Sequence, residues 1–301
     1  MKFYKVTAKL IIGLCVLSFT AAGQRRPASS SVVINTEPNA IVWIDEIRRG
    51  NTDASGRIEL KVLPGRHVVK VRASGFKESS VPLVAGRRTL AVKLVRTTDQ
   101  AELLFQQAEE AREKARDDAA KEEAANLYRE TLKLRPAFPA ARVGLARLLL
   151  DLNQYQAALS EIDAARRVRR IYPEASAVEG RIHREAAFTD EAIASFRRAI
   201  REGKGFQPEA HVGLARVLEE QGNYAEAEAE YRKAIAQLSD SEPVIYQMLG
   251  AAYEKQRKNK EAVAAYEKYL ALAPNGSLAP AVRSIIDQLR REAEGGLDII
   301  P

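Results

Sequence analysis

Three arginines at nearly equal spacing offer the clearest binding chemistry in the sequence. Arg147 and Arg181 are 34 residues apart, and Arg216 follows 35 residues later. A guanidinium group presents parallel N–H donors, so it binds a carboxylate in a bidentate manner. A stripe of such groups predicts a site for an acidic or C-terminal peptide. The alternative is that these arginines pair locally with neighbouring acids such as Glu219 and Glu254.

Catalytic motifs are missing from the sequence. It has no glycine-rich phosphate loop, no nucleophile elbow and no histidine pair at zinc-binding spacing. The single cysteine, Cys15, excludes an internal disulfide and a thiolate metal cluster. Ser74 and Lys77 match the S-x-x-K spacing, but they end an expected strand without companion motifs, and we attribute the match to chance. We therefore expect no enzyme activity, no metal site and no cofactor.

The first 23 residues have the layout of an export signal. Lys2, Lys5 and Lys9 precede a mostly apolar stretch over residues 10–19, which small residues follow. That stretch is short for a membrane span, and the layout is typical of a cleavable secretory signal. We expect a signal peptide over 1–23, a periplasmic or secreted protein, and no membrane span after cleavage. An uncleaved N-terminal membrane anchor is the alternative.

Charge divides the rest of the chain into two parts. Residues 24–96 carry 14 basic and six acidic residues, whereas residues 97–301 carry 30 basic and 34 acidic residues. The basic part favours an anionic envelope surface or polysaccharide as a partner, and ordinary solvated sheet faces are the alternative. The 46% hydrophobic content excludes a wholly disordered chain.

The basic part has the pattern of short strands. A polar linker over 24–31 precedes residues 32–96, where β-branched runs alternate with turn signals. The expected strands cover residues 32–34, 41–44, 60–62, 67–71 and 90–94. Val69 and Val71 alternate with Lys70, which predicts one buried and one solvated face. Turns at about ten-residue spacing predict a small antiparallel β-sandwich.

Several short motifs in this part resemble the PEGA domain, a small β-sandwich of bacterial surface and secreted proteins. The tetrapeptide Glu37-Pro38-Asn39-Ala40, the strand over 42–45, and the Pro-Gly turn with its strand over 63–71 carry the likeness. Asn39 replaces the usual glycine, and asparagine adopts positive φ more readily than most residues. The resemblance implies an envelope or ligand-binding module without catalysis.

After residue 97 the apolar period changes from two to about 3.6, and similar units recur. The array spans 97–276, with units over 105–138, 139–172, 173–207, 208–242 and 243–276. A period near 34 residues is typical of stacked helix–turn–helix repeats. Pro139, Pro173, Pro208 and Pro243 stand where a first helix could start, a position that needs no N–H donor.

Small and bulky residues recur at matching places in these units and resemble the tetratricopeptide repeat. The structural positions are Ala124, Tyr128, Ala146, Ala158, Gly180, Ala192, Phe196, Ala215, Ala227, Tyr231, Gly250, Ala262 and Tyr266. The resemblance implies an all-α solenoid whose rings are core, not platforms for bases, so we expect no nucleic-acid partner. Residues 277–294 have the pattern of a capping helix with Ser277 as N-cap, and 295–301 form a tail.

In tetratricopeptide arrays the first helices of the units line a concave groove that holds a peptide or partner helix. The resemblance implies that the candidate groove residues are Arg147, Arg181, Arg184, Arg216, Glu219 and Glu254. We expect a non-enzymatic exported adaptor or scaffold that binds a protein or peptide partner, with the sandwich orienting or tethering it at the cell envelope. The alternative is a cell-wall or anionic polysaccharide-binding protein that uses the basic sandwich, with the array as spacer.

Overall fold

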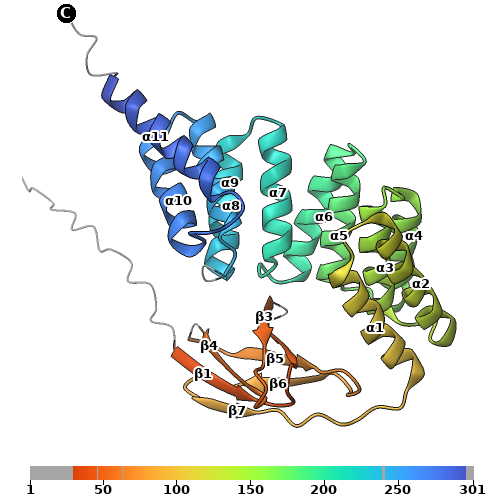
Figure 1. Ribbon diagram of the computed structural model, residues 1–301. Coiled ribbons are helices and arrows are strands. Elements are labelled where there is room, and N and C mark those ends of the chain that lie inside the picture. The colour runs from red at the N-terminus through yellow and green to blue at the C-terminus, as the bar shows by residue number, and fades with distance from the viewer. Residues whose placement is uncertain (1–29, 46, 63, 239–240, 296–301) are drawn as a thin grey trace, which may run out of the picture.

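The computed structural model describes residues 30–45, 47–62, 64–238 and 241–295 (Figure 1). The expected signal peptide and nearly all of the expected linker lie outside the described residues. No described helix combines the length and the apolar character that crossing a membrane requires.

The front part of the chain folds into two small sheets, which we call the β-domain (residues 30–96). Its described strands are β1 (Ser30–Asn35), β2 (Ile41–Ile44), β3 (Ile47–Asn51), β4 (Arg57–Val62), β5 (His67–Arg72), β6 (Ser79–Leu83) and β7 (Thr89–Ala91). One sheet has the order β4-β1-β7 and the other β3-β2-β5-β6. The expectation of a purely antiparallel domain is wrong for one pair, because β1 and β7 run parallel.

Both sheets bury the apolar residues that alternate along their strands. Val32 and Ile34 of β1 and Val69 and Val71 of β5 are almost fully buried in one cluster. Lys70, between the two valines of β5, keeps more exposure, as the alternation predicts. Asn39 adopts a φ of 55° in the turn before β2, so the prediction of positive φ there is confirmed.

The sequence analysis missed two strands, β3 and β6. β3 reads Ile-Arg-Arg-Gly-Asn, which shows no alternation of apolar and polar residues. It forms because it pairs with β2, through a register shift between Val42 and Trp43. β6 contains Pro82, which weakens the strand signal, and this strand lies at the edge of its sheet.

The rest of the described chain consists of helices that pair in sequence order. They are α1 (Gln100–Lys114), α2 (Asp118–Leu134), α3 (Pro139–Asp151), α4 (Tyr155–Val168), α5 (Pro173–Glu185), α6 (Thr189–Glu202), α7 (Pro208–Glu220), α8 (Tyr224–Leu238), α9 (Val244–Lys255), α10 (Asn259–Leu272) and α11 (Ala279–Gly295). Five pairs, α1/α2 to α9/α10, form a solenoid. Pro139, Pro173 and Pro208 begin their helices as expected, whereas Pro243 is the N-cap of α9.

Rings from the second helices fill the space beside glycines on the first helices. Tyr128, Phe196, Tyr231 and Tyr266 are fully buried or nearly so. A Cβ added at Gly180 would lie 2.6 Å from the Phe196 ring. The close packing of each pair therefore depends on small residues opposite large ones.

The last helix, α11, covers the exposed end of the stack. Val282, Ile286 and Leu289 on one face are buried in the apolar cluster shared with α9 and α10. The helix starts at Ala279, two residues after Ser277, so the expectation that Ser277 directly precedes the helix as its N-cap is wrong.

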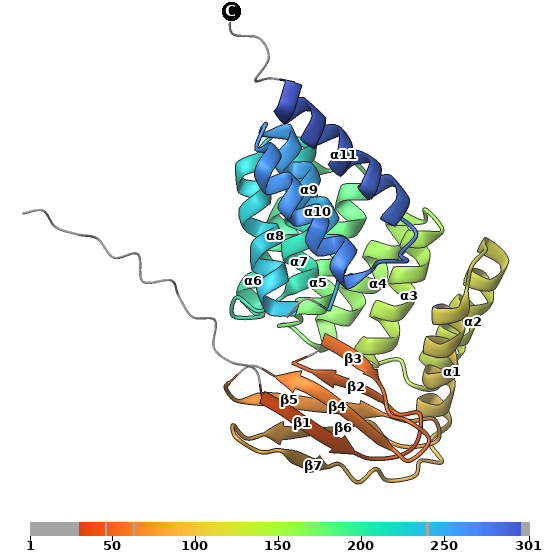
Figure 2. The same cartoon turned by 60° about the vertical axis from the view of Figure 1, so that its left-hand side comes forward.

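The β-domain lies beneath the arc of helices, as two views of the molecule show (Figure 1 and Figure 2). In both views β3 is the strand nearest the lower ends of the array helices. The polypeptide passes from the β-domain directly into α1, whose N-terminus is capped by the side chain of Asp99.

Candidate functional site

The first helices of the units line the inner side of the solenoid. α3 contacts α5, and α5 contacts α7, whereas the second helices contact mainly the helices on either side of them in sequence. A curved stack brings the helices on its inner side closer together than those outside, so α3, α5, α7 and α9 form the concave side. The predicted groove residues belong to these helices.

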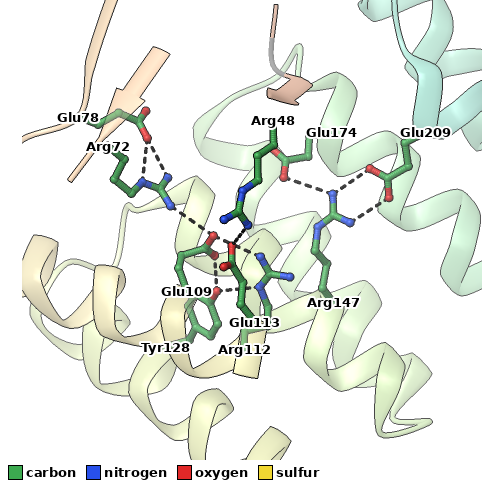
Figure 3. Close-up of polar contacts among 10 residues, drawn as sticks. All are labelled: Arg48, Arg72, Glu78, Glu109, Arg112, Glu113, Tyr128, Arg147, Glu174 and Glu209. Atoms are coloured by element: carbon green, nitrogen blue, oxygen red, sulfur yellow. Dashed lines mark hydrogen bonds and ion pairs between the residues drawn. The ribbon is translucent and has the colours of Figure 1, made fainter. Parts of the chain in front are cut away.

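Two of the predicted arginines meet on the concave side in what we call the inner charge cluster. It consists of Arg147, Asp151, Glu174, Arg181 and Glu209, from α3, α5 and α7. Arg147 donates through both terminal nitrogens to the Glu209 carboxylate at 2.9 Å, and one of these nitrogens lies 3.3 Å from Glu174 (Figure 3). Arg181 lies 3.6 Å from Glu209 and 3.8 Å from Asp151. The cluster spans three successive units.

Glu209 is the electrostatic centre of this cluster. Its burial disfavours ionisation, but the charge and hydrogen bonds of Arg147, together with the charge of Arg181, outweigh that effect and lower the pKa of Glu209 to about 2. Burial likewise disfavours the charged form of Arg147, yet Glu209 and Glu174 raise the pKa of Arg147 above its ordinary value. Both groups therefore stay ionised across physiological pH.

The structure does not bring the other predicted groove residues into this cluster. Arg184 donates to the neighbouring Glu185. Glu219 accepts a hydrogen bond from Tyr231, and Glu254 accepts one from Tyr266. Each carboxylate therefore binds the hydroxyl group of the buried tyrosine in its own unit. Burial raises the pKa of Glu219 despite the Tyr231 hydrogen bond.

Arg216 differs from the other two arginines of the stripe. It is exposed on α7, where its charge favours the ionised forms of Glu185 and Glu219 without a direct hydrogen bond to either among the described residues. The predicted basic stripe is thus divided. Arg147 is tied to its carboxylates, Arg181 has two long ion pairs and keeps 35% of its side-chain exposure, and Arg216 is open. Local pairing explains Arg147 best, with Glu209 and Glu174 as partners and not the two acids that the spacing suggested.

A second polar network, which the sequence analysis missed, joins the β-domain to the first repeat. Arg72 of β5 donates to Glu78 through two nitrogens, at 2.8 and 3.1 Å, and to Glu109 of α1 at 3.3 Å (Figure 3). The guanidinium carbon also lies 5.2 Å from the centre of the Trp43 ring and 4.8 Å from that of Phe105. Only 12% of the Arg72 side chain is exposed.

Glu109 extends this network into the array. It accepts hydrogen bonds from Tyr128 of α2 and from Arg112 of its own helix. Burial opposes ionisation of Glu109, but the charges of Arg112 and Arg72 lower its pKa below the ordinary value. The buried ring of the first unit is thereby connected to the β-domain through one carboxylate.

Backbone groups of the β-domain are also engaged by α1. The side-chain oxygen of Gln106 accepts from the Gly75 N–H at 2.9 Å, and its nitrogen donates to the Phe76 carbonyl at 2.7 Å. Gln106 is buried, so this two-way contact satisfies both ends of its amide.

β3 adds contacts to the first and fourth units of the array. Arg48 donates to Glu113 of α1 at 2.6 Å (Figure 3). Arg49 donates to the carbonyl of Leu238, the last residue of α8, at 3.2 Å. Ile47 is buried in the apolar cluster of helices α5 to α11. The only sequence signal for these contacts was the opposite net charge of the two parts.

The described residues contain no group of three or more His, Cys, Asp or Glu side chains arranged to hold a metal ion. Three basic residues of the β-domain, Arg48, Arg49 and Arg72, face the array. Their positive charges are therefore not available to bind a polyanion.

Comparisons with known proteins bear on the array. Tetratricopeptide repeat models match residues 121–182, 178–243 and 243–275. No curated protein matches the sequence.

Similar solved structures include TTC0263, a thermophilic TPR protein of Thermus thermophilus, at 20% identity and a TM-score of 0.52, covering 63% of this chain and 98% of that chain. PilW, a widely conserved type IV pilus biogenesis factor, is 14% identical with a TM-score of 0.53 and coverage of 68% and 96%. Identities this low show the fold alone. Residues 121–275 of this chain therefore consist of tetratricopeptide repeats.

Proposed function

We propose that this chain is an exported, non-enzymatic adaptor that binds a protein or peptide segment on the concave side of its repeat array. The β-domain, which we take to be PEGA-like, orients or tethers the array at the cell envelope. The charge pattern of the concave side carries this proposal. Arg181 and Arg216 present donors that a partner carboxylate can reach, while Arg147 holds Glu209 in place.

The charge arrangement also favours exchange of ion pairs upon binding. The Arg181 pairs are 3.6 and 3.8 Å long, and their partners Glu209 and Asp151 remain one-third to one-half exposed. Exposed pairs of this kind contribute little to stability, so a partner can replace them at small cost. An acidic segment therefore has two arginines to bind without displacing the bidentate Arg147–Glu209 pair.

The polysaccharide alternative has less support. The net charge of the front part suggested it, yet Arg48, Arg49 and Arg72 bind the array. Of the other basic residues, Arg96 lies 5.3 Å from the centre of the Phe76 ring and Lys70 lies 5.1 Å from that of Trp43, so the front part keeps only scattered pairs of basic and aromatic side chains for such a ligand.

Site-specific photo-crosslinking in envelope extracts tests the proposal. A photoreactive residue replaces Arg216 on the concave α7 or, as a matched control, the exposed Arg197 on α6. We expect a discrete protein adduct from position 216 and none from position 197. Arg181→Ala combined with Arg216→Ala should weaken capture of the identified partner about tenfold or more. Equal adducts from both positions would reject the concave side as the site.

A further inference from the structure

The contact between β3 and the far part of the array is separate from the core of the β-domain. Ile47 keeps 9% exposure, yet it belongs to the apolar cluster of α5 to α11 and not to the cluster between the two sheets. Arg49 reaches the Leu238 carbonyl at the end of α8. Unpaired carbonyls at a helix C-terminus carry partial negative charge, which suits a guanidinium donor.

The β-domain is attached to the array at two places that differ in their number of polar contacts. Toward α1 it has the Arg72 network, the two-way amide contact of Gln106 and the Arg48–Glu113 ion pair. Toward the fourth unit the described residues supply one hydrogen bond, at 3.2 Å, while Ile47 is buried in the apolar cluster that extends over α5 to α11. Among the described residues, the β-domain thus has more polar contacts with the first unit than with the fourth, and we call the contact at the fourth unit the weaker one.

Polar atoms at the weaker contact are incompletely satisfied. The Nε atom of Arg49 and the Oε1 atom of Gln237, the residue before Leu238, are both buried without a hydrogen-bond partner among the described residues. Burying such atoms unpaired opposes the closed arrangement, because water would hydrate them if the contact opened. Burial also lowers the pKa of Arg49, which indicates the same loss of hydration.

We propose that β3 is a latch. Ile47 and Arg49 close the β-domain against the fourth unit, and a partner segment that enters the concave side binds more tightly when this latch is open. The proposal rests on the proposed function for its second half only. The coupling is reciprocal, so a partner that prefers the open form also opens the latch.

The position of the contact explains why closure of the latch competes with binding of a partner segment. Arg48 and Arg49 are adjacent on one strand, yet they bind Glu113 of the first unit and Leu238 of the fourth. The strand thus connects the first unit to the fourth and restrains their separation. The inner charge cluster, in the second to fourth units, lies within the stretch that β3 bridges.

Distance measurements without any partner test the latch itself. Residues 24–301 contain no cysteine, so spin labels can be placed on cysteines introduced at the exposed Ser80 and Ser241. The latch variants are Ile47→Ser and Arg49→Ala. Matched controls are Val68→Ser and Arg87→Ala, which replace exposed residues of the β-domain. Ile47 lies outside the core of the β-domain, so its replacement should leave that domain folded.

We expect one narrow distance population for the parent and both controls. Each latch variant should add a longer distance, with the ratio of open to closed molecules raised about tenfold, as for loss of one charge-assisted hydrogen bond. Unchanged distances in both latch variants would overturn the proposal.

A second measurement tests the coupling to binding. The adduct from the photoreactive residue at position 216 should form about fivefold more readily in the Arg49→Ala background than in the Arg87→Ala background. If the latch opens and an adduct forms equally in both backgrounds, the competition is wrong. If the latch opens but no adduct forms in any background, the proposed function fails while the latch stands.

Discussion

At the scale of single residues, one carboxylate organises the concave side. Glu209 receives both terminal nitrogens of Arg147 and lies beside Arg181. These three side chains come from three different units, so their pairing holds the curvature of the stack as well as its charge balance. This contribution to the curvature does not depend on the net charge of the cluster, because each arginine has an acid within ion-pair distance.

Replacing Glu209 by glutamine should destabilise the array. The variant removes the bidentate partner of Arg147 and leaves that largely buried guanidinium with Glu174 alone. We expect a loss of about 1–3 kcal/mol in the free energy of unfolding, measured by urea denaturation at pH 7. Glu220→Gln, at an exposed position of the same helix, is the control and should stay within about 0.5 kcal/mol of the parent.

The pH dependence of that loss follows from the sign of the pKa change. The pKa of Glu209 is lower in the folded state, about 2, than its ordinary value of 4.5. Its stabilisation is complete above the ordinary value and is lost as pH falls from about 5 to about 2. Because the side chain is one-third exposed, we expect about 1–2 kcal/mol. The parent and Glu209→Gln should converge over this range, and a constant difference down to pH 2 would contradict the assignment.

At the scale of helices, three of the second helices place a ring against a glycine of a first helix. The Phe196 ring contacts the positions where Gly180 and Gly213 would carry a Cβ, at 2.6 and 2.3 Å. Gly144 and Gly250 stand in the same relation to Tyr128 and Tyr266. The rings thus bind each second helix to its own first helix or to that of the next unit.

Gly180→Ala should therefore overpack the third unit. We expect a loss of about 1–3 kcal/mol in the free energy of unfolding, because the added methyl group overlaps the Phe196 ring. Combining it with Phe196→Leu should cost less than the sum of the single changes, since a smaller side chain makes room for the methyl group. Strictly additive urea midpoints would show that Gly180 and Phe196 are not in contact.

At the scale of the whole molecule, Arg72 is a principal contact that holds the β-domain and the array together. It links β5 to α1 through Glu109, and its guanidinium lies between the rings of Trp43 and Phe105. Burial disfavours its charged form, but Glu78 and Glu109 together raise the pKa of Arg72 above the ordinary value. The array and the β-domain are therefore coupled through a buried, charged guanidinium group.

Arg72→Ala should release the β-domain from the first unit. Trp43 is the only tryptophan of the chain, so its emission reports this interface directly. We expect a shift of the emission to longer wavelength and a weakening of the interface by about 2–3 kcal/mol, seen as separate unfolding transitions of the two parts. Arg72→Lys should rescue little, because an ammonium group cannot bridge two carboxylates as the planar fork does. Unchanged emission in Arg72→Ala would contradict this role.

The sequence by itself determined the repeat array. Helix pairs, ring positions and small residues follow from contacts within a unit or with the next one, and these leave a regular period that can be counted. Residues such as Tyr128, Phe196 and Tyr266 were therefore predicted as core before any coordinates. The inner arginines were also found, because the same period places them on one side of the stack.

Only the tertiary structure decided which charges pair and where the β-domain sits. Arg147 and Glu209 are 62 residues apart, and Arg49 and Leu238 are 189 apart. Such partners have no periodic relation in the sequence, since they depend on the curvature accumulated over several units. β3 escaped prediction for the same reason, because its residues suit the array surface and not the alternation of a strand. Local periodicity specifies local packing, whereas the contacts between distant surfaces follow from the shape of the folded whole.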